Sequence, residues 1–264
     1  ALGRGADIAV ITVGSYLETM ADHFRVCLEH GVNIITTEEE TVYPWTTATK
    51  SATELDTIAR KNDVTLVASG VQEVFWLRLI TVLMGAAQRI ESVQGRCSWN
   101  ADDFGPEVTS HVCVGENPDV FRHHVRDHGW PEFVARQTLE AMVASTGLSV
   151  VEVSSKVEPV VAEVDTPSNS MGSVVPAGRM LGTIDITTVK TAEGPEVDEN
   201  EWWVRGEPNL HLHNHDVPSR LITCSTTVNR VPDVINAEPG LISLDRLPHP
   251  RYRHHDLHTY VTRI

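Results

Sequence analysis

The sequence predicts an α/β protein whose first part contains a parallel sheet and whose second part is an α+β domain with a broad mixed or antiparallel sheet. Two observations predict this. Up to Gly70, three short apolar runs alternate with two segments of helical periodicity, joined by short turns. Strands that alternate with helices in this way pair in parallel through right-handed crossovers. Beyond about Ser149, segments rich in β-forming residues dominate instead.

The first part is expected to contain strands at 7–13, 32–37 and 64–68. The run Asp7–Val13 is apolar and is closed by Gly14 and Ser15, which is typical of a buried parallel strand. Helical spacing of apolar residues predicts a helix that starts near Leu17 and ends before Gly31, and a second helix is expected at 53–62.

The second part is expected to begin with three helices and one strand and to continue with four β-rich segments. The turn-rich segment 165–178 is interpreted as a lid or substrate loop. Helices are predicted at 73–87, 117–127 and 131–145, a strand at 89–99, and β-rich segments at 149–164, 180–190, 201–214 and 219–228.

Composition excludes several classes of function. The formal net charge of -15 leaves no basic surplus to neutralise phosphates, so we expect no nucleic-acid partner. No apolar run is long enough for a bilayer and no signal-type segment is seen, so no membrane partner and a cytoplasmic location are expected. The four cysteines form no CxxC pair, which fits reduced thiols.

The densest polar cluster runs from Thr36 to Glu40 at the carboxyl end of a predicted parallel strand. Open α/β sheets bind ligands at this position, although a solvated acidic turn is the alternative interpretation. Tyr43, Pro44 and Trp45 follow and form either a rigid pocket wall or a packed loop.

Two other groups leave alternatives open. Phe75 and Trp76 follow another predicted strand end and are either a substrate wall or packing between domains. His211, His213 and His215 alternate, so a strand would place them on one face, where solvent exposure is a commoner outcome than metal binding; no metal is expected. There is no GxSxG, and Gly3-Arg4-Gly5 precedes a strand, whereas a dinucleotide fingerprint follows one.

Five segments in order resemble blocks of the 2,4-diaminopentanoate dehydrogenase and native amine dehydrogenase family, which is related to dihydrodipicolinate reductase. The blocks with EE-x-x-YPW and VNR-x-PDV are the most specific. The segments are DIAVITVGSYLE, GVNIITTEEETVYPW, SGVQEVFW, DDFGPEV and TVNRVPDVINAEPGLISLDRLPHPR.

The resemblance implies a Rossmann domain, a second domain with substrate contacts and the dimer interface, and a returning segment, here 1–69, 70–225 and 226–264. A homodimer is therefore expected. Family members carry a GxGxxG strand-turn-helix unit ahead of the point where this chain starts, so the Rossmann-type sheet is expected without its first βα units. The implied cofactor is NADP or NAD, and the sequence does not choose between them.

The resemblance also implies the reaction and its residues. An amine is oxidised to a carbonyl and ammonium, and in reverse a small aldehyde or ketone is aminated with ammonia. The family's catalytic glutamate maps to Glu39, with Glu40 as the alternative. Substrate contacts map to Tyr43, Phe75, Trp76 and Phe104, and cofactor contacts to Gly14, Ser15, Thr36, Thr37 and Asn229.

Two rival interpretations stay open. A dihydrodipicolinate reductase-like imine reductase would act on a preformed cyclic imine and need not activate ammonia. A non-catalytic dimeric remnant without cofactor binding would account for the missing glycine fingerprint.

Overall fold

The computed structural model describes residues 5–86, 89–98, 101–128, 135–147, 157–185 and 198–262. Contacts divide the chain into two compact units. The first unit comprises Ala1–Gly85, Arg136–Val151 and Ser219–Ile264, and the second comprises Ala86–Ala135 and Glu152–Pro218.

The first unit is built on a parallel sheet of four strands in the order β1-β2-β3-β11. Strand β1 pairs with β2, β2 with β3, and β3 with β11, all in parallel. The predicted parallel sheet is therefore confirmed, and a fourth strand from the end of the chain joins it. The strands are β1 (Ile8–Ile11), β2 (Asn33–Thr36), β3 (Thr65–Ala68) and β11 (Gly240–Leu241).

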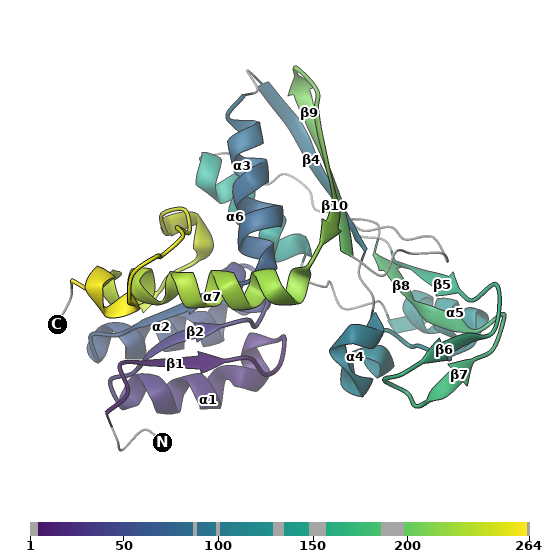
Figure 1. Ribbon diagram of the computed structural model, residues 1–264, viewed down its shortest axis with the longest axis horizontal. Coiled ribbons are helices and arrows are strands. Elements are labelled where there is room, and N and C mark those ends of the chain that lie inside the picture. Colours follow the sequence, from purple (N-terminus) through teal and green to yellow (C-terminus); the bar gives the residue numbers. More distant parts are fainter. Residues whose placement is uncertain are drawn as a thin grey trace. The chain divides into compact units, whose positions relative to one another are not determined.

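Helices α1 (Leu17–Glu29) and α2 (Thr49–Lys61) follow β1 and β2. In α1 the buried residues include Leu17, Met20, Phe24 and Leu28, whose spacing of three and four places them on one face. They form one apolar core with α2 and the sheet, in which Ile34, Leu55 and Leu66 have no exposed surface. Figure 1 shows α7 on the opposite side of the sheet from α1.

The helix predicted at 73–87 is formed, but its first part is a π-helix. The π-helix η3 covers Gln72–Arg78, and the α-helix α3 continues over Leu79–Met84. Wide π turns are rare and occur mostly as short insertions in longer helices. The first unit also contains α6 (Ala135–Thr146), which agrees with the helix predicted at 131–145, although 131–134 lie outside the described residues.

The β-rich segment predicted at 219–228 is wrong, because these residues belong to helix α7 (Ser219–Asn236). Its β-branched residues favour a strand locally, but propensity is a weak preference that tertiary packing overrides. Thr226, Thr227, Arg230 and Val234 are buried, and their spacing is that of one helix face.

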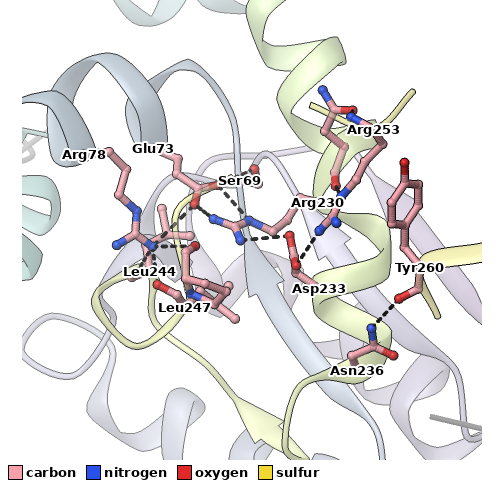
Figure 2. A network of polar contacts seen from close by, with 12 residues as sticks. Ser69, Glu73, Arg78, Arg230, Asp233, Asn236, Leu244, Leu247, Arg253 and Tyr260 are labelled. Carbon is pink, nitrogen blue, oxygen red and sulfur yellow. Dashed lines mark hydrogen bonds and ion pairs between the residues drawn. The ribbon is translucent and has the colours of Figure 1, made fainter. Parts of the chain in front are cut away.

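A buried ion pair connects α7 to the π-helix (Figure 2). Arg230 and Glu73 have no exposed surface, and the Arg230 guanidinium contacts the Glu73 carboxylate through Nη2 and, at 3.3 Å, through Nε. The Ser69 hydroxyl donates a hydrogen bond of 2.8 Å to the same carboxylate. The Glu73–Arg230 ion pair thus links three elements, which are the end of β3, the π-helix and α7.

The network continues to the end of the chain. Asp233 accepts hydrogen bonds from Arg230 at 3.2 Å and from Arg253 at 2.7 Å. Arg78 donates to the carbonyl oxygens of Leu244 and Leu247, beyond β11. Burial lowers the pKa of Arg78, and the neighbouring Glu73 partly opposes this. The segment from Leu244 to Arg253 is therefore tied to the core by arginine hydrogen bonds.

The second unit is antiparallel, as predicted, and its described strands form three separate sheets rather than one broad sheet. The predicted segment 201–214 is two strands that are joined by a short turn, and the turn-rich segment 165–178 contains a hairpin. Parts of the segments predicted at 149–164 and 180–190 lie outside the described residues. The sheets are β10-β9-β4 (Leu210–Val217, Asp198–Glu207, Arg89–Ser98), β5-β8 (Val157–Val161, Met180–Asp185) and β6-β7 (Thr166–Ser168, Ser173–Val175).

The helices of the second unit are short. The helix α5 (Pro118–His128) agrees with the helix predicted at 117–127, and the Asn117 side chain caps it by accepting a hydrogen bond from the Asp119 amide at 2.8 Å. The helix α4 covers Pro106–His111 and a 3-10 helix, η4, covers Ala101–Phe104. No helix in the described parts of either unit is both long and apolar enough to cross a membrane.

Replacing Arg230 by alanine is expected to destabilise the protein by about 3–5 kcal/mol, because it leaves the buried Glu73 carboxylate without its cation. Arg122→Ala is the matched control. Arg122 pairs with Asp119 on an exposed surface, where an ion pair contributes about 0–1 kcal/mol. Urea unfolding measures both variants, and equal losses would contradict the importance of the Glu73–Arg230 pair.

Candidate active site

The carboxyl ends of the parallel strands meet at one edge of the sheet in the first unit. Ile11 of β1 is opposite Thr36 of β2, which is opposite Ala68 of β3. The segments that follow, Gly14-Ser15, Thr37–Glu40 and Ser69-Gly70, therefore leave the sheet at this edge. Ligands of open α/β sheets bind at such an edge.

Gly14 allows the chain to turn closely between β1 and α1. Its φ is +75°, and a Cβ at this position would lie 2.7 Å from Met20 Sδ. A side chain would meet both backbone strain and a clash. The turn consequently presents backbone and the Ser15 side chain at the strand edge.

The predicted cofactor residues Thr36 and Thr37 lie at the end of β2. Thr36 is buried, and its hydroxyl accepts a hydrogen bond of 3.0 Å from the Glu38 amide. Thr37 is half-buried, and its amide donates to the Ile11 carbonyl at 3.2 Å. Thr36 thus shapes the turn, while Thr37 lies closer to solvent.

Glu38 is buried and stabilises the turn that follows β2. Its carboxylate accepts hydrogen bonds from the amides of Glu40 at 2.8 Å and Thr41 at 3.0 Å, and from the Thr41 hydroxyl. It caps the 3-10 helix η2 (Glu40–Val42) in this way. Burial raises the pKa of Glu38 to about 8, although the hydrogen bonds from Thr41 and Glu40 oppose the shift.

Glu40 caps helix α1. Its Oε2 accepts a hydrogen bond of 2.9 Å from the amide of Leu17, the first residue of that helix. Its own amide donates to the Ser15 carbonyl at 3.3 Å. A carboxylate at a helix N-terminus is favourable for both the free N–H groups and the helix dipole.

Glu39 differs from both neighbours because its carboxyl group has spare hydrogen-bonding capacity. Its Oε2 is buried and has no hydrogen-bond partner among the described residues. Burial raises the pKa of Glu39 to about 7, and a hydrogen bond from the Ser15 side chain opposes the shift. A carboxyl group whose pKa lies near 7 both accepts and releases protons readily at neutral pH.

Tyr43 follows η2 and lies near two further acids. Burial raises the pKa of its hydroxyl, and the negative charges of Asp245 and Glu140 raise it further. Glu140 accepts from the Thr46 hydroxyl, while Asp245 Oδ1 is buried without a partner among the described residues. Asp245 and Glu140 are not evident from local sequence, because they reach Tyr43 from the segment after β11 and from α6.

Phe75 and Trp76 are both half-buried on the π-helix η3. The chain enters this helix through Gly70, whose φ is +154°, and the Val71 amide donates to the Thr223 hydroxyl at 3.1 Å. The two aromatic residues are therefore positioned by the turn after β3 and by α7. Their contact with a substrate stays a prediction.

Phe104 and Asn229 are not brought to this edge by any described contact. Phe104 ends η4 in the second unit. Asn229, on α7, uses its side-chain oxygen to accept a hydrogen bond of 3.2 Å from the Arg253 amide. The described role of Asn229 is to fasten the C-terminal segment, and its cofactor contact stays a prediction.

The alternating histidines lie on strand β10, where His211, His213 and His215 are exposed. His211 Nε2 lies 2.8 Å from Glu201 Oε1 and its ring stacks on Trp203. Among the residues that the structure describes, no group of three or more side chains is arranged to hold a metal ion.

Comparisons with known proteins agree with the sequence resemblance. A family model described as the 2,4-diaminopentanoate dehydrogenase C-terminal domain matches residues 75–263. The chain is 26% identical to 2,4-diaminopentanoate dehydrogenase from Acetoanaerobium sticklandii, over 94% of this chain and 75% of that protein. It is 41% identical to the amine dehydrogenase of Mycobacterium smegmatis, with a TM-score of 0.85, over 94% of this chain and 77% of that one.

These matches confirm the predicted family and fold class, and both relatives are dehydrogenases by name. The family model alone covers more than half of the chain. The chain belongs to the 2,4-diaminopentanoate dehydrogenase family of oxidoreductases.

Proposed function

We propose that the protein is an NAD(P)-dependent amine dehydrogenase that catalyses the reversible oxidative deamination of an amine, or the reductive amination of a small aldehyde or ketone with ammonia. The observation that carries this proposal is the Glu39 carboxyl group, which is buried at the edge of the parallel sheet with Oε2 unpartnered among the described residues. The relationship to two dehydrogenases of amines supports it.

The reaction requires a group that accepts and donates protons and that stabilises the positively charged iminium. In the oxidative direction the ionised Glu39 accepts a proton from the substrate ammonium and passes it to solvent, and the regenerated carboxylate stabilises the iminium by a charge-assisted hydrogen bond. The same carboxylate removes a proton from the water that attacks the iminium carbon. In the reverse direction it protonates the carbinolamine hydroxyl, which leaves as water.

The nicotinamide cofactor, NADP or NAD, accepts or supplies the hydride when it is bound. The described strand ends support a place for the nicotinamide ribose: Gly14 keeps the first turn free of a side chain, and Ser15 and the half-buried Thr37 supply hydroxyl groups at the same edge of the sheet. No GxGxxG turn occurs in the 264 residues, so no residue of this sequence is assigned to the cofactor phosphates.

The remaining roles are assigned by the same reasoning. Substrate contacts are proposed for Tyr43, Phe75, Trp76 and Phe104. Large aromatic side chains would fill much of the pocket and leave room only for a small carbonyl compound. We also propose that residues 1–69 and 226–264 serve the cofactor, that residues 70–225 serve substrate binding and dimerisation, and that the active form is a cytoplasmic homodimer.

Glu39→Gln is expected to lower kcat for amine oxidation by about 10²–10⁴-fold, since an amide neither accepts the substrate proton nor balances the iminium charge. Absorbance of the reduced nicotinamide measures turnover. Glu54→Gln, on α2, is the control and should retain full activity. Wild-type turnover that survives in Glu39→Gln would remove Glu39 from the mechanism.

Cofactor oxidation with a small aldehyde is expected to require ammonium, because the imine must form before hydride transfer. The assay is run with and without ammonium, and then with a preformed cyclic imine. Turnover of the cyclic imine alone would identify an imine reductase. Failure to bind either cofactor in a fluorescence titration would instead identify the chain as a non-catalytic module.

Stability should also depend on the ionisation of Glu39. Burial raises the pKa of Glu39 from its ordinary value of 4.5 to about 7 in the folded protein. Between these pH values the folded state binds more protons than the unfolded state. The free energy of unfolding therefore falls as the pH rises through this range. Replacement by glutamine is expected to stabilise the protein by at most about 3 kcal/mol above pH 7, and not below pH 4.5. Denaturant unfolding at pH 4 and pH 8 measures the difference, and an equal effect at both would contradict the raised pKa.

A further inference from the structure

The second unit contains a small cavity that the proposed function does not use. Its volume is about 320 Å³, at the lower end of the range for ligand pockets. We propose that it binds a small aliphatic ammonium ion beside Glu116, and that Asp102 holds the turn with Met171 as one of its walls. The described residues around it include none of those proposed to contact substrate or cofactor, so this is a second site.

Helix α4 and the turn that ends it form two walls of the cavity. Thr109 and Ser110 line it from α4, and Cys113 and Val114 line it from the turn. The Cys113 amide donates to the Ser110 carbonyl at 3.0 Å, and the Val114 amide donates to the Thr109 carbonyl at 3.0 Å. Cys113 has a φ of +58°, a left-handed conformation in which helices often end. Backbone hydrogen bonds therefore fix both walls.

The third wall is the turn of the β6–β7 hairpin, which Asp102 holds. Its carboxylate accepts hydrogen bonds from the Ser168 hydroxyl at 2.5 Å, the Asn169 amide at 2.7 Å and the Ser170 amide at 3.1 Å. The Ser170 hydroxyl donates to the Asp102 carbonyl oxygen at 2.6 Å. Burial opposes the ionisation of Asp102, but these hydrogen bonds outweigh burial and lower its pKa.

Met171 follows in the same turn and lines the cavity. Its amide donates to the Ser168 hydroxyl oxygen at 3.2 Å, and its methyl carbon lies 3.6 Å from the position that a Cβ on Gly115 would take. The side chain therefore reaches from the hairpin to the turn after α4. It is still 43% exposed, so a flexible apolar side chain at the edge of the cavity has surface left to contact a ligand.

The polar groups around the cavity favour a positively charged hydrogen-bond donor. Glu116 is the only charged residue among the described residues that line it. The Thr109 and Ser170 hydroxyls already donate to backbone carbonyl oxygens, at 3.1 Å and 2.6 Å, so their oxygens can only accept. Burial raises the pKa of the Cys113 thiol, and the charge of Glu116 raises it further, so the thiol adds no second anion. Acceptors and one carboxylate beside apolar side chains match an alkylammonium ion.

Binding is measured in the full chain by NMR of protein labelled at the methyl carbons of its five methionines. Met171→Leu identifies the Met171 signal. Titration with n-butylammonium chloride should shift this signal, whereas the signals of Met20 and Met84, which are buried in the first unit, should not move. The similar-sized n-butanol and butyrate should bind about tenfold more weakly, because neither carries a positive charge.

Glu116→Gln tests the anion of the site. The variant is expected to raise the Kd for n-butylammonium about three- to tenfold, because a charge-assisted hydrogen bond becomes a neutral one. Glu163→Gln is the matched control, since Glu163 is exposed in the same unit and does not line the cavity. Equal Kd values for Glu116→Gln and wild type would overturn the role of Glu116.

Asp102→Asn tests the wall. Asparagine offers one oxygen in place of two, so at least one donor of the hairpin turn loses its acceptor. We expect the Met171 signal to sharpen and the Kd to rise about tenfold, as the turn becomes mobile. Ser168→Ala removes one donor to Asp102 and should act in the same direction, whereas Asp119→Asn, on the exposed surface of α5, should match wild type. Wild-type signals and Kd values in both Asp102→Asn and Ser168→Ala would overturn the role of Asp102.

The titration needs neither cofactor nor turnover, and Glu39→Gln separates the cavity from the proposed active site. The Met171 shift should persist in that variant, with a Kd within about twofold of wild type. A shift that is lost in Glu39→Gln, or a Met171 signal that never moves, would overturn the second site. Equal binding of n-butylammonium, n-butanol and butyrate would overturn the ligand class. Binding without any amine oxidation would remove only the proposed function.

Discussion

The buried pair of Glu73 and Arg230 is the constraint on which the first unit depends. A carboxylate and a guanidinium that are removed from water lose several kcal/mol of hydration each, and only close contact and further hydrogen bonds offset this loss. Here Ser69 and Asp233 provide those hydrogen bonds. Each partner of this group must be in place, so the end of β3, the π-helix and α7 adopt one relative arrangement.

Because that arrangement is fixed, the strand edge presents its polar residues in one geometry. Three adjacent residues of the same type acquire different properties there: Glu38 caps a turn, Glu40 caps a helix, and Glu39 keeps a buried oxygen without a partner among the described residues. The chemical difference between them comes from burial and hydrogen bonds, since the side chains are identical.

The local sequence is sufficient for the parallel sheet and its helices, because apolar runs at 7–13, 32–37 and 64–68 and the helical spacing of Leu17 to Leu28 are local signals. It predicts the wrong structure for α7, in which β-branched residues lie on a helix that packing stabilises. The pairing of Glu73 with Arg230 was not predicted, since 157 positions separate the two residues. The sequence predicts a site at the end of β2, and the different hydrogen bonds of Glu39 and Glu40 there depend on turn geometry that strand alternation does not contain.

The order of segments in the first unit has a consequence for synthesis. Its sheet takes three strands from the start of the chain and β11 from near the end, and the whole second unit lies between them in the sequence. During synthesis the outer edge of β3 therefore has no neighbouring strand until β11 has left the ribosome. The residues of the intervening unit are therefore synthesised first, and the parallel sheet of the first unit is completed only when β11 is added.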